Sequence, residues 1–184
     1  NIDVLKFFLN HKHMNRYAIM GNHEDMILRD EMFNIWQYNG GAVTLKEMED
    51  YGMSLDHLKE ELSRLPYVIY VVDPTGEKSF RVVHGEFPLV NDDILYNSLK
   101  VSHRDSKLAQ CAVWNREVVE NRYNISKKCA AREFIEEHQP MKTFSGHTPV
   151  GDMFWSLDNR HYIDTGMKTL TLIDAHSLRC WLAT

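Results

Sequence analysis

Three short apolar segments of this 184-residue chain end at a glycine that has a histidine beside it or two positions further on. They stop at Gly-Asn-His-Glu (21–24), His-Gly-Glu (84–86) and Gly-His-Thr (146–148). Short apolar runs bounded by such turn residues are typical of buried β-strands. Strands of one sheet bring their ends together in space even when they lie far apart in the sequence. The pattern therefore predicts a sheet that carries a cluster of histidines at one edge.

The residue types in this cluster are those of a metal site. Imidazole nitrogens bind zinc, iron, manganese or nickel, and an amide oxygen adds a harder ligand. We therefore predict that Asn22, His84 and His147 hold one divalent transition-metal ion. The neighbouring glycines let the backbone come close to the ion or its substrate, because they carry no Cβ.

Each histidine also has a simpler interpretation. Any one of them could be a buried core residue with satisfied hydrogen bonds, and Asn22 and His23 could form an ordinary turn between a strand and a helix. A zinc site that only stabilises the fold is less expected, because the predicted ligands include no thiolate. The three cysteines of the chain form no Cys-x-x-Cys pair.

The rest of the chain has the pattern of an α/β protein. Apolar spacing predicts helices at 2–12, at 24–33, from a capping box at Thr44 to about Gly52, and from Ser54 to about Leu65. Alternating and β-branched runs predict strands at 17–20, 67–72, 79–83, 143–145, 153–157, 160–163, 168–174 and 178–182. Residues 91–138 are charged and amphipathic, which predicts several helices with Trp114 as a buried anchor. These elements favour two packed sheets flanked by helices, in a single domain over 1–184.

Charge and composition exclude several classes of function. The net charge of −5 argues against binding to nucleic acid or to a membrane surface, since both need a basic patch. The sequence has no apolar run of the roughly 18 residues that a membrane-spanning helix needs. Three widely spaced cysteines do not suggest a disulfide framework. We therefore expect a cytoplasmic protein.

The order and spacing of the three motifs resemble the metal-binding motifs of the calcineurin-like metallophosphoesterases. The resemblance is to the branch of bacterial and phage-type serine/threonine phosphoprotein phosphatases and symmetrical dinucleoside tetraphosphatases. Four further segments resemble that branch, and they extend the resemblance over nearly the whole chain. They are 36–41 followed by Thr44, Leu65-Pro66, Trp114-Asn115-Arg116 and Tyr-Ile-Asp-Thr-Gly at 162–166.

The resemblance implies a fold, a mechanism and roles for individual residues. The implied fold is the family's four-layer β-sandwich flanked by helices. Asn22, His84 and His147 would bind one ion of a centre of two divalent ions, which are manganese, iron or zinc. His23 would protonate the leaving-group oxygen, and Arg116 would bind phosphate oxygens, although Arg116 could also be an ordinary surface residue. A hydroxide that bridges the two ions would attack the phosphorus atom.

The departures from the family pattern are also informative. The family motifs G-D-x-H-G and G-D-x-x-D-R-G, which supply the ligands of the other ion, do not occur in this chain. We therefore expect the chain to be the C-terminal portion of a longer protein and to lack the first strands of the fold. It would then hold at most one partly liganded ion, and it would be inactive by itself. Glu86 stands where the family commonly has a small residue, and we expect it to be a solvent-facing loop residue rather than a partner that orients His84.

The expected function is the hydrolysis of phosphomonoesters in a phosphorylated protein or a small phosphoester. A serine/threonine protein phosphatase is the leading interpretation, and a symmetrical dinucleoside tetraphosphatase would use the same metal chemistry. A non-catalytic phosphoesterase-like module that binds a phosphorylated partner is the alternative from a different class. The missing motifs favour this alternative if the 184 residues are the complete protein.

Overall fold

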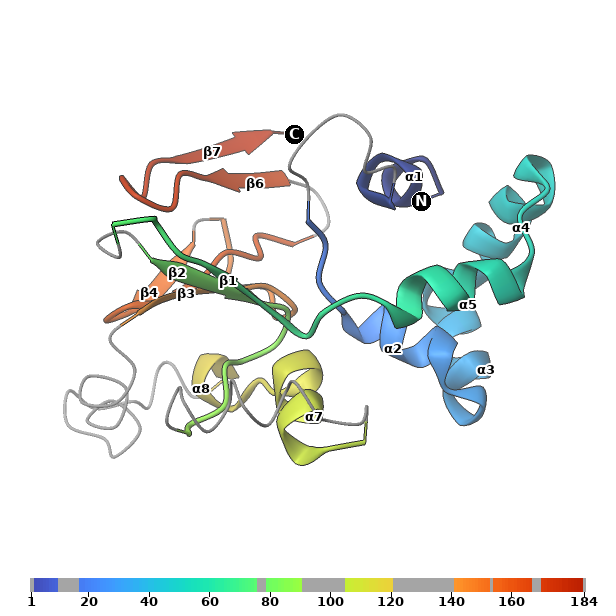
Figure 1. The fold of residues 1–184 in the computed structure, drawn as a ribbon, viewed down its shortest axis with the longest axis horizontal. Coiled ribbons are helices and arrows are strands. Elements are labelled where there is room, and N and C mark those ends of the chain that lie inside the picture. The colour runs from blue at the N-terminus through green and yellow to red at the C-terminus, as the bar shows by residue number, and fades with distance from the viewer. Residues whose placement is uncertain are drawn as a thin grey trace. The chain divides into compact units, whose positions relative to one another are not determined.

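The structure is a computed structural model that describes residues 2–9, 17–75, 79–90, 105–120, 141–152, 154–166 and 170–183 (Figure 1). The chain divides into two compact units, residues 1–66 and residues 67–184. In the described ranges the first unit is helical and the second combines strands with helices. The protein is therefore a mixed α/β protein, in agreement with the coarse fold class expected from the sequence.

The first unit is built from short helical segments. In chain order they are α1 (Ile2–Leu9), α2 (Asn22–Leu28), the 3₁₀ turn η1 (Asp30–Met32), α3 (Phe33–Trp36), the π-helical η2 (Gln37–Gly41), α4 (Ala42–Tyr51) and α5 (Leu55–Ser63). Helix α5 buries Leu58 and Leu62, one turn apart on one face, and α2 buries Met26 and Ile27. Burial of these apolar side chains is what stabilises segments that are too short to be stable helices alone.

The prediction of a strand at 17–20 is wrong. This segment has no regular secondary structure, Tyr17 is 70% exposed, and only Met20 is buried. A strand needs a ladder of hydrogen bonds to a neighbour, whereas the Met20 N–H donates to a single carbonyl, that of Pro66, at 2.8 Å. The apolar composition of the segment thus reflects the burial of one end and not membership of a sheet.

Two helix boundaries also differ from the sequence pattern. Helix α4 begins at Ala42 and not at a Thr44 cap, because the chain enters it from η2 through a kink at Gly40, which has a φ of 102°. The N–H groups of its first turn therefore have helical carbonyls before them and do not need a capping side chain. The helix expected over 24–33 is not continuous, because the chain there is divided into α2, η1 and α3. The end of α4 at Gly52, with a φ of 63°, is confirmed.

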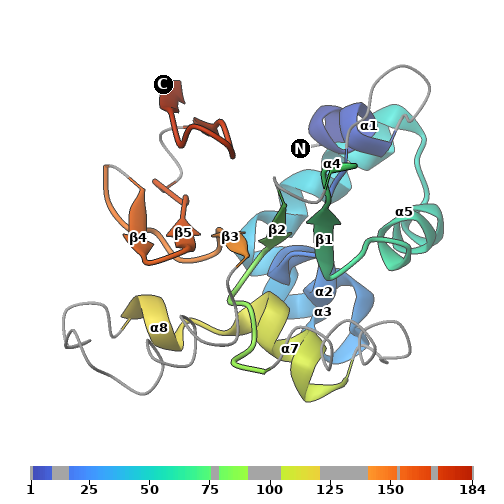
Figure 2. The ribbon, with the colours of Figure 1, turned by 60° about the vertical axis from the view of Figure 1, so that its left-hand side comes forward.

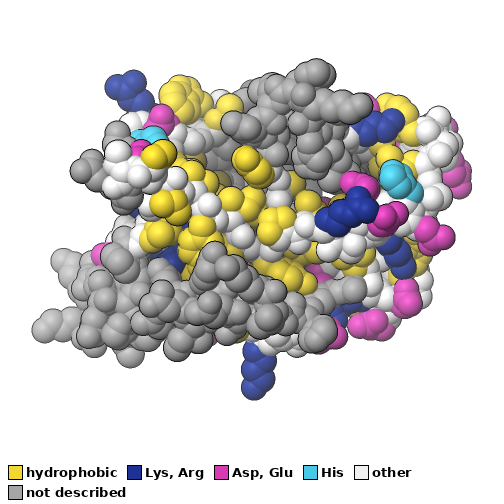
Figure 3. Space-filling model, in the orientation of Figure 1, with side chains coloured by type: hydrophobic (Ala, Val, Ile, Leu, Met, Phe, Trp, Pro, Cys, Tyr) yellow, Lys and Arg dark blue, Asp and Glu magenta, His cyan; other side chains and the backbone are white. Residues whose placement is uncertain are grey.

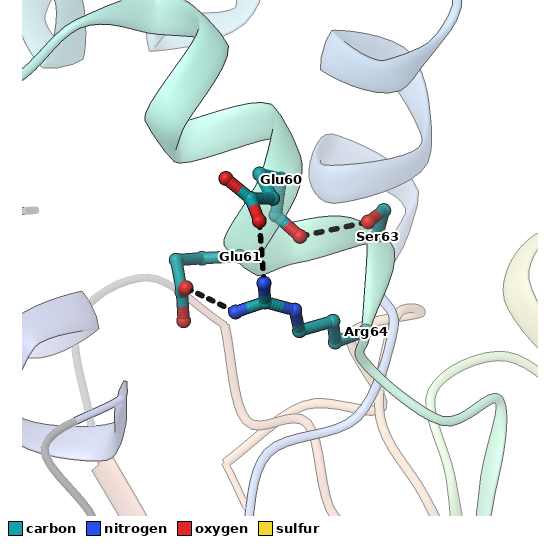
Figure 4. A network of polar contacts seen from close by, with 4 residues as sticks. All are labelled: Glu60, Glu61, Ser63 and Arg64. Carbon is teal, nitrogen blue, oxygen red and sulfur yellow. Dashed lines mark hydrogen bonds and ion pairs between the residues drawn. The ribbon is translucent and has the colours of Figure 1, made fainter.

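Both ends of α5 carry the polar contacts that a helix terminus requires. Ser54 Oγ accepts the His57 N–H at 3.1 Å, and the helix begins near Ser54, as the sequence pattern predicted. At the other end the Arg64 guanidinium contacts the carboxylates of Glu60 and Glu61, and Ser63 Oγ donates to the Glu60 carbonyl (Figure 4). These ion pairs are largely exposed, so they add little stability.

The close packing of Gly41 against Trp36 leads to a first prediction. A Cβ at Gly41 would stand 2.4 Å from the buried Trp36 indole, so Gly41→Ala is expected to lower the free energy of unfolding by about 3 kcal/mol or more. Gly52→Ala is the comparison, because there only the positive φ opposes a side chain and the expected cost is about 1 kcal/mol. Urea unfolding followed by circular dichroism measures both. Equal losses in the two variants would contradict this packing.

The second unit contains a five-stranded mixed sheet and a two-stranded sheet. The strands are β1 (Val68–Val71), β2 (Phe80–Val83), β3 (Lys142–Ser145), β4 (Trp155–Leu157), β5 (Arg160–Tyr162), β6 (Leu170–Ile173) and β7 (Cys180–Ala183). The larger sheet has the order β1-β2-β3-β5-β4, in which β2, β3 and β5 are parallel and both edge strands are antiparallel to their neighbours. The hairpin and the later strands expected from the sequence are confirmed.

Two helices pack on the larger sheet through separate apolar clusters. Helix α7 (Lys107–Trp114) places Ala112 against Val83 and Phe87, at the β1–β2 side. Helix α8 (Glu117–Glu120) places Val118 and Val119 against residues of β4 and β5 (Figure 2). Trp114, expected as a buried anchor, is only half-buried. The helices expected within 91–104 and 121–138 lie outside the described residues.

The β6–β7 hairpin is attached to the larger sheet at its turn. Lys142 Nζ, at the start of β3, donates to the carbonyls of Ala175 and His176 at 3.3 and 3.2 Å. The hairpin itself exposes Leu170, Leu172 and Trp181, and Figure 3 shows hydrophobic side chains over it. Among the described helices, none combines the length and apolar character needed to cross a membrane.

Candidate functional site

The parallel pairing of β2 and β3 brings two of the sequence-predicted ligands together. Val83 and Ser145, the last residues of the two strands, are register partners, so both strands end at the same level of the sheet. His84 follows β2 directly, and His147 comes two residues after β3. Their side chains meet with His84 Nε2 3.1 Å from His147 Nδ1. The backbone joins the two ends as well, because the Gly146 N–H donates to the His84 carbonyl at 3.0 Å.

His147 has an unusual backbone conformation. Its φ is 67°, in the left-handed region that residues other than glycine rarely adopt. The turn is closed by a hydrogen bond from the Thr148 N–H to the Gly146 carbonyl at 2.8 Å. A left-handed residue of this kind costs free energy and persists where the surroundings determine it, which is frequent at functional sites.

Arg116 completes a chain of three side chains. Its Nε donates to His147 Nε2 at 3.0 Å, and the rings of Trp114 and His147 are nearly perpendicular, with centroids 6.1 Å apart. A guanidinium can only donate, so His147 Nε2 must accept, and the proton of this neutral imidazole is assigned to Nδ1. His147 Nδ1 then donates to His84 Nε2. Arg116 is half-buried in this contact and is not an ordinary surface residue.

Binding of a metal ion to both imidazoles would replace the hydrogen bond between them. Two nitrogens that each lie about 2.1 Å from a tetrahedral ion stand about 3.4 Å apart. The 3.1 Å between His84 Nε2 and His147 Nδ1 is shorter, so the two rings would move slightly apart to bind the ion. An ion on His147 Nδ1 would move the imidazole proton to Nε2, which could then no longer accept from Arg116. Binding of an ion would thus release the guanidinium for another acceptor, such as a phosphate oxygen.

Two imidazoles do not complete the coordination of a metal ion, so such an ion would need further ligands. The described residues hold no group of three or more His, Cys, Asp or Glu side chains arranged for a metal. The third ligand predicted from the sequence is the amide of Asn22. Asn22 and His23 belong to the first unit, whereas His84, Arg116 and His147 belong to the second. Of the five predicted site residues, the structure therefore brings together His84, Arg116 and His147.

Asn22 and His23 lie at the beginning of α2. The turn before them is closed by Glu24, whose Oε2 accepts the Gly21 N–H at 3.1 Å. His23 is exposed, and it lines a cavity of about 420 Å³ within the first unit. Ile27 and Trp36 contribute apolar walls to this cavity. His23 therefore stands at the rim of a partly apolar cavity, where a small molecule can approach its imidazole.

Glu86 is a buried residue, and the expectation that it faces solvent is wrong. Its side chain is 2% exposed, and its carboxylate accepts hydrogen bonds from Asn115 Nδ2 at 3.0 Å, from the Val118 N–H at 3.1 Å and from the Val119 N–H at 2.9 Å. Burial raises the pKa of the Glu86 carboxyl, and the two backbone bonds oppose that rise. The first turn of α8 needs acceptors for its N–H groups, and Glu86 supplies them from a distant part of the chain.

Gly85 allows the loop after β2 to lie against the end of α7. Its N–H donates to the Ala112 carbonyl at 2.7 Å, and a Cβ would stand 2.9 Å from the carbonyl carbon of Val113. The nearby Cys111 thiol contacts the Glu86 carbonyl at 3.7 Å, and burial raises its pKa to about 11. Burial therefore disfavours the thiolate of Cys111, which is the nucleophilic form of a cysteine.

The sequence was compared with family models and with curated proteins. None of the family models and none of the curated proteins that were compared matches the sequence.

Proposed function

We propose that this protein belongs to the metal-dependent phosphoesterases of the calcineurin-like type and has the four-layer sandwich fold of that family. The proposed reaction is the hydrolysis of phosphomonoesters, with phosphoserine or phosphothreonine in proteins as the leading substrate class. The proposed metal ligands in this chain are Asn22, His84 and His147. Arg116 is proposed to bind phosphate oxygens, and His23 to protonate the leaving group.

One observation carries this proposal. Two imidazoles from segments about sixty residues apart meet at 3.1 Å, and a guanidinium lies 3.0 Å from one of them. In this chain of hydrogen bonds His84 Nε2 and His147 Nε2 both accept, so both imidazoles are neutral, which is the form that binds a metal ion. The same arrangement suits a divalent ion and the anion that binds beside it.

The side chains have separable tasks in the proposed reaction. Bound divalent ions would supply Lewis-acid chemistry, by lowering the pKa of water and neutralising phosphate charge. His84, His147 and the Asn22 amide would hold an ion and fix its place relative to the substrate. The Arg116 guanidinium would orient two phosphate oxygens through its planar fork. The His23 imidazole can carry a proton near neutral pH and would deliver it to the leaving oxygen.

Full activity is proposed to need ligands in addition to these. The three residues named here account for one ion, and the family motifs that supply the other ion do not occur in the 184 residues. The chain alone is therefore expected to bind an ion but to turn over little or no substrate.

Phosphate release from para-nitrophenyl phosphate with Mn²⁺ tests the proposal. The assay is run on the 184-residue chain and on the same chain extended by any coding sequence that precedes Asn1. The extended form is expected to release phosphate, to stop on chelation with EDTA and to recover with Mn²⁺, whereas the chain alone is expected to release almost none. Equal turnover by both forms would contradict the need for further ligands. Binding of a phosphopeptide without any metal-dependent release would support the non-catalytic module instead.

The same assay distinguishes the substrate classes. A phosphoserine peptide and a dinucleoside tetraphosphate are compared at equal concentration with the active form. Faster release from the peptide is the expected result, and preference for the dinucleotide would move the assignment to the tetraphosphatase branch.

A further inference from the structure

We propose that Glu86 is a positioning residue for Arg116: it holds the backbone on both sides of Arg116 so that the guanidinium meets His147. The proposed consequence, that Glu86 determines phosphate affinity through Arg116, rests on the proposed function. The positioning itself rests on the contacts of Glu86, and nothing in the sequence pattern assigned it this task.

The three donors that Glu86 accepts from flank Arg116. Asn115, whose side-chain amide donates to Glu86 Oε2, comes directly before the arginine. The amides of Val118 and Val119, which donate to Oε2 and Oε1, come two and three residues after it. Both carboxylate oxygens are thus used, and the segment 115–119 is fixed to one side chain at its two ends.

The backbone around Arg116 is also bonded to its own helices. The Asn115 N–H donates to the Cys111 carbonyl at 3.1 Å, and the Glu120 N–H donates to the Arg116 carbonyl at 2.8 Å. These bonds set the local turn between α7 and α8, but they do not attach it to the sheet. Glu86 and the bond from Gly85 N–H to the Ala112 carbonyl add polar attachments to the loop after β2, beside the apolar packing of α7 and α8 on the sheet.

A carboxylate is the group that this position requires. Three N–H groups converge on the side chain, and an ionised carboxylate accepts at both oxygens and donates at neither. Glutamine would place its own NH₂ against one of these donors, and the buried N–H would lose its partner. Because Glu86 is buried, water cannot replace the lost acceptor.

The loop after β2 therefore has two functions within three residues. His84 reaches the candidate metal site directly, and Glu86 reaches it through Arg116. His147, which His84 and Arg116 both contact, follows the adjacent strand β3. The short segment 84–86 therefore sets the distance between His84, a candidate metal ligand, and Arg116, the candidate phosphate-binding residue.

The first test measures the position of Arg116 without any ligand. In the metal-free 184-residue chain, NMR follows the Arg116 Nε–H, which is expected to exchange slowly with water because it donates to His147. Glu86→Gln and Asn115→Ala are expected to make this proton exchange rapidly. Glu120→Gln, the same change of side chain at an exposed position of α8, should leave it slow. A slow and unshifted Arg116 Nε–H in both test variants would overturn the positioning role.

The second test measures phosphate affinity by titrating inorganic phosphate into the zinc-loaded chain. Glu86→Gln and Arg116→Ala are each expected to weaken phosphate binding by about tenfold, the loss of one charge-assisted interaction. The double variant should lose no more than Arg116→Ala alone, and Zn²⁺ affinity should stay unchanged in Glu86→Gln. Losses that add up in the double variant, or Zn²⁺ affinity that falls in step with phosphate affinity, would overturn the proposal.

The two tests separate this inference from the proposed function. If the zinc-loaded wild-type chain binds no phosphate, the proposed function fails, and the Arg116 Nε–H still decides whether Glu86 positions Arg116. If Glu86→Gln does not fold, Asn115→Ala decides both measurements, because it removes one of the three donors and keeps the two backbone bonds.

Discussion

Replacing His147 by alanine is expected to weaken the binding of a single Zn²⁺ ion by the 184-residue chain by more than about 100-fold, and His84→Ala is expected to do the same. Loss of only a hydrogen-bond partner of a metal ligand costs about 10- to 100-fold in affinity, so loss of the ligand itself should exceed that range. Each imidazole supplies one of the two nitrogens that stand 3.1 Å apart. With one nitrogen removed, the other imidazole alone is a weak and unselective ligand.

Competition with a chromophoric chelator measures this affinity, and circular dichroism verifies that the variants are folded. His57→Ala is the matched control, because His57 is an exposed histidine on α5 of the first unit. It should bind Zn²⁺ as tightly as the wild-type chain. If His57→Ala loses as much affinity as His147→Ala, the ion is bound by dispersed surface histidines and not by the proposed pair.

Gly85→Ala is expected to destabilise the second unit by about 3 kcal/mol. A Cβ at this position would meet Val113 backbone atoms at 2.9 and 3.0 Å and the Ala112 carbonyl oxygen at 3.1 Å. Backbone atoms of a packed helix cannot move aside as a flexible side chain can, so the loop must shift, at a cost in the range of about 1–3 kcal/mol for overpacking. The bond from Gly85 N–H to Ala112, at 2.7 Å, would be weakened in addition.

Urea unfolding, followed by NMR amide signals from the second unit, measures the effect of Gly85→Ala. Gly146→Ala is the matched control, because its Cβ would meet only the His84 carbonyl oxygen, at an ordinary 3.7 Å. The control should keep the free energy of unfolding of the wild-type chain. A Gly85→Ala chain as stable as Gly146→Ala would show that the loop after β2 does not lie against α7.

The meeting of His84 and His147 could be predicted from the sequence because it depends on a property of strands. Two β-branched or aromatic runs, each ending at a histidine and glycine, were sufficient to expect neighbouring strand ends. The parallel register of Val83 with Ser145 is the reason that these ends coincide. Periodicity also predicted α5 and the β1–β2 hairpin, since local apolar spacing and turn residues determine both.

The role of Glu86 could not be predicted because its partners are distant in the sequence. Val118 and Val119 lie more than thirty residues away, and their N–H groups meet the Glu86 carboxylate only in the folded chain. A glutamate after a glycine has the local pattern of an exposed loop, and only tertiary structure reverses that interpretation. The contact of Arg116 with His147 is of the same kind, since no local spacing relates the two residues.

For the segment 17–20 the local pattern predicted a strand that the structure does not contain. Its apolar residues match a strand pattern, but strand structure depends on a neighbour that supplies a hydrogen-bond ladder. Here the described backbone contact of Met20 is with Pro66, in the connection after α5. The pattern detected a buried position correctly at Met20, and it assigned the wrong secondary structure to the residues before it.

The central proposal is that His84 and His147 hold a metal ion beside Arg116. An anomalous difference map from crystals of the chain grown with Mn²⁺ tests it most directly. The predicted result is a manganese peak bonded to His84 Nε2 and His147 Nδ1, with Arg116 no longer bonded to His147. A map with manganese bound at other residues, and with the contact between His84 and His147 intact, would contradict the claim.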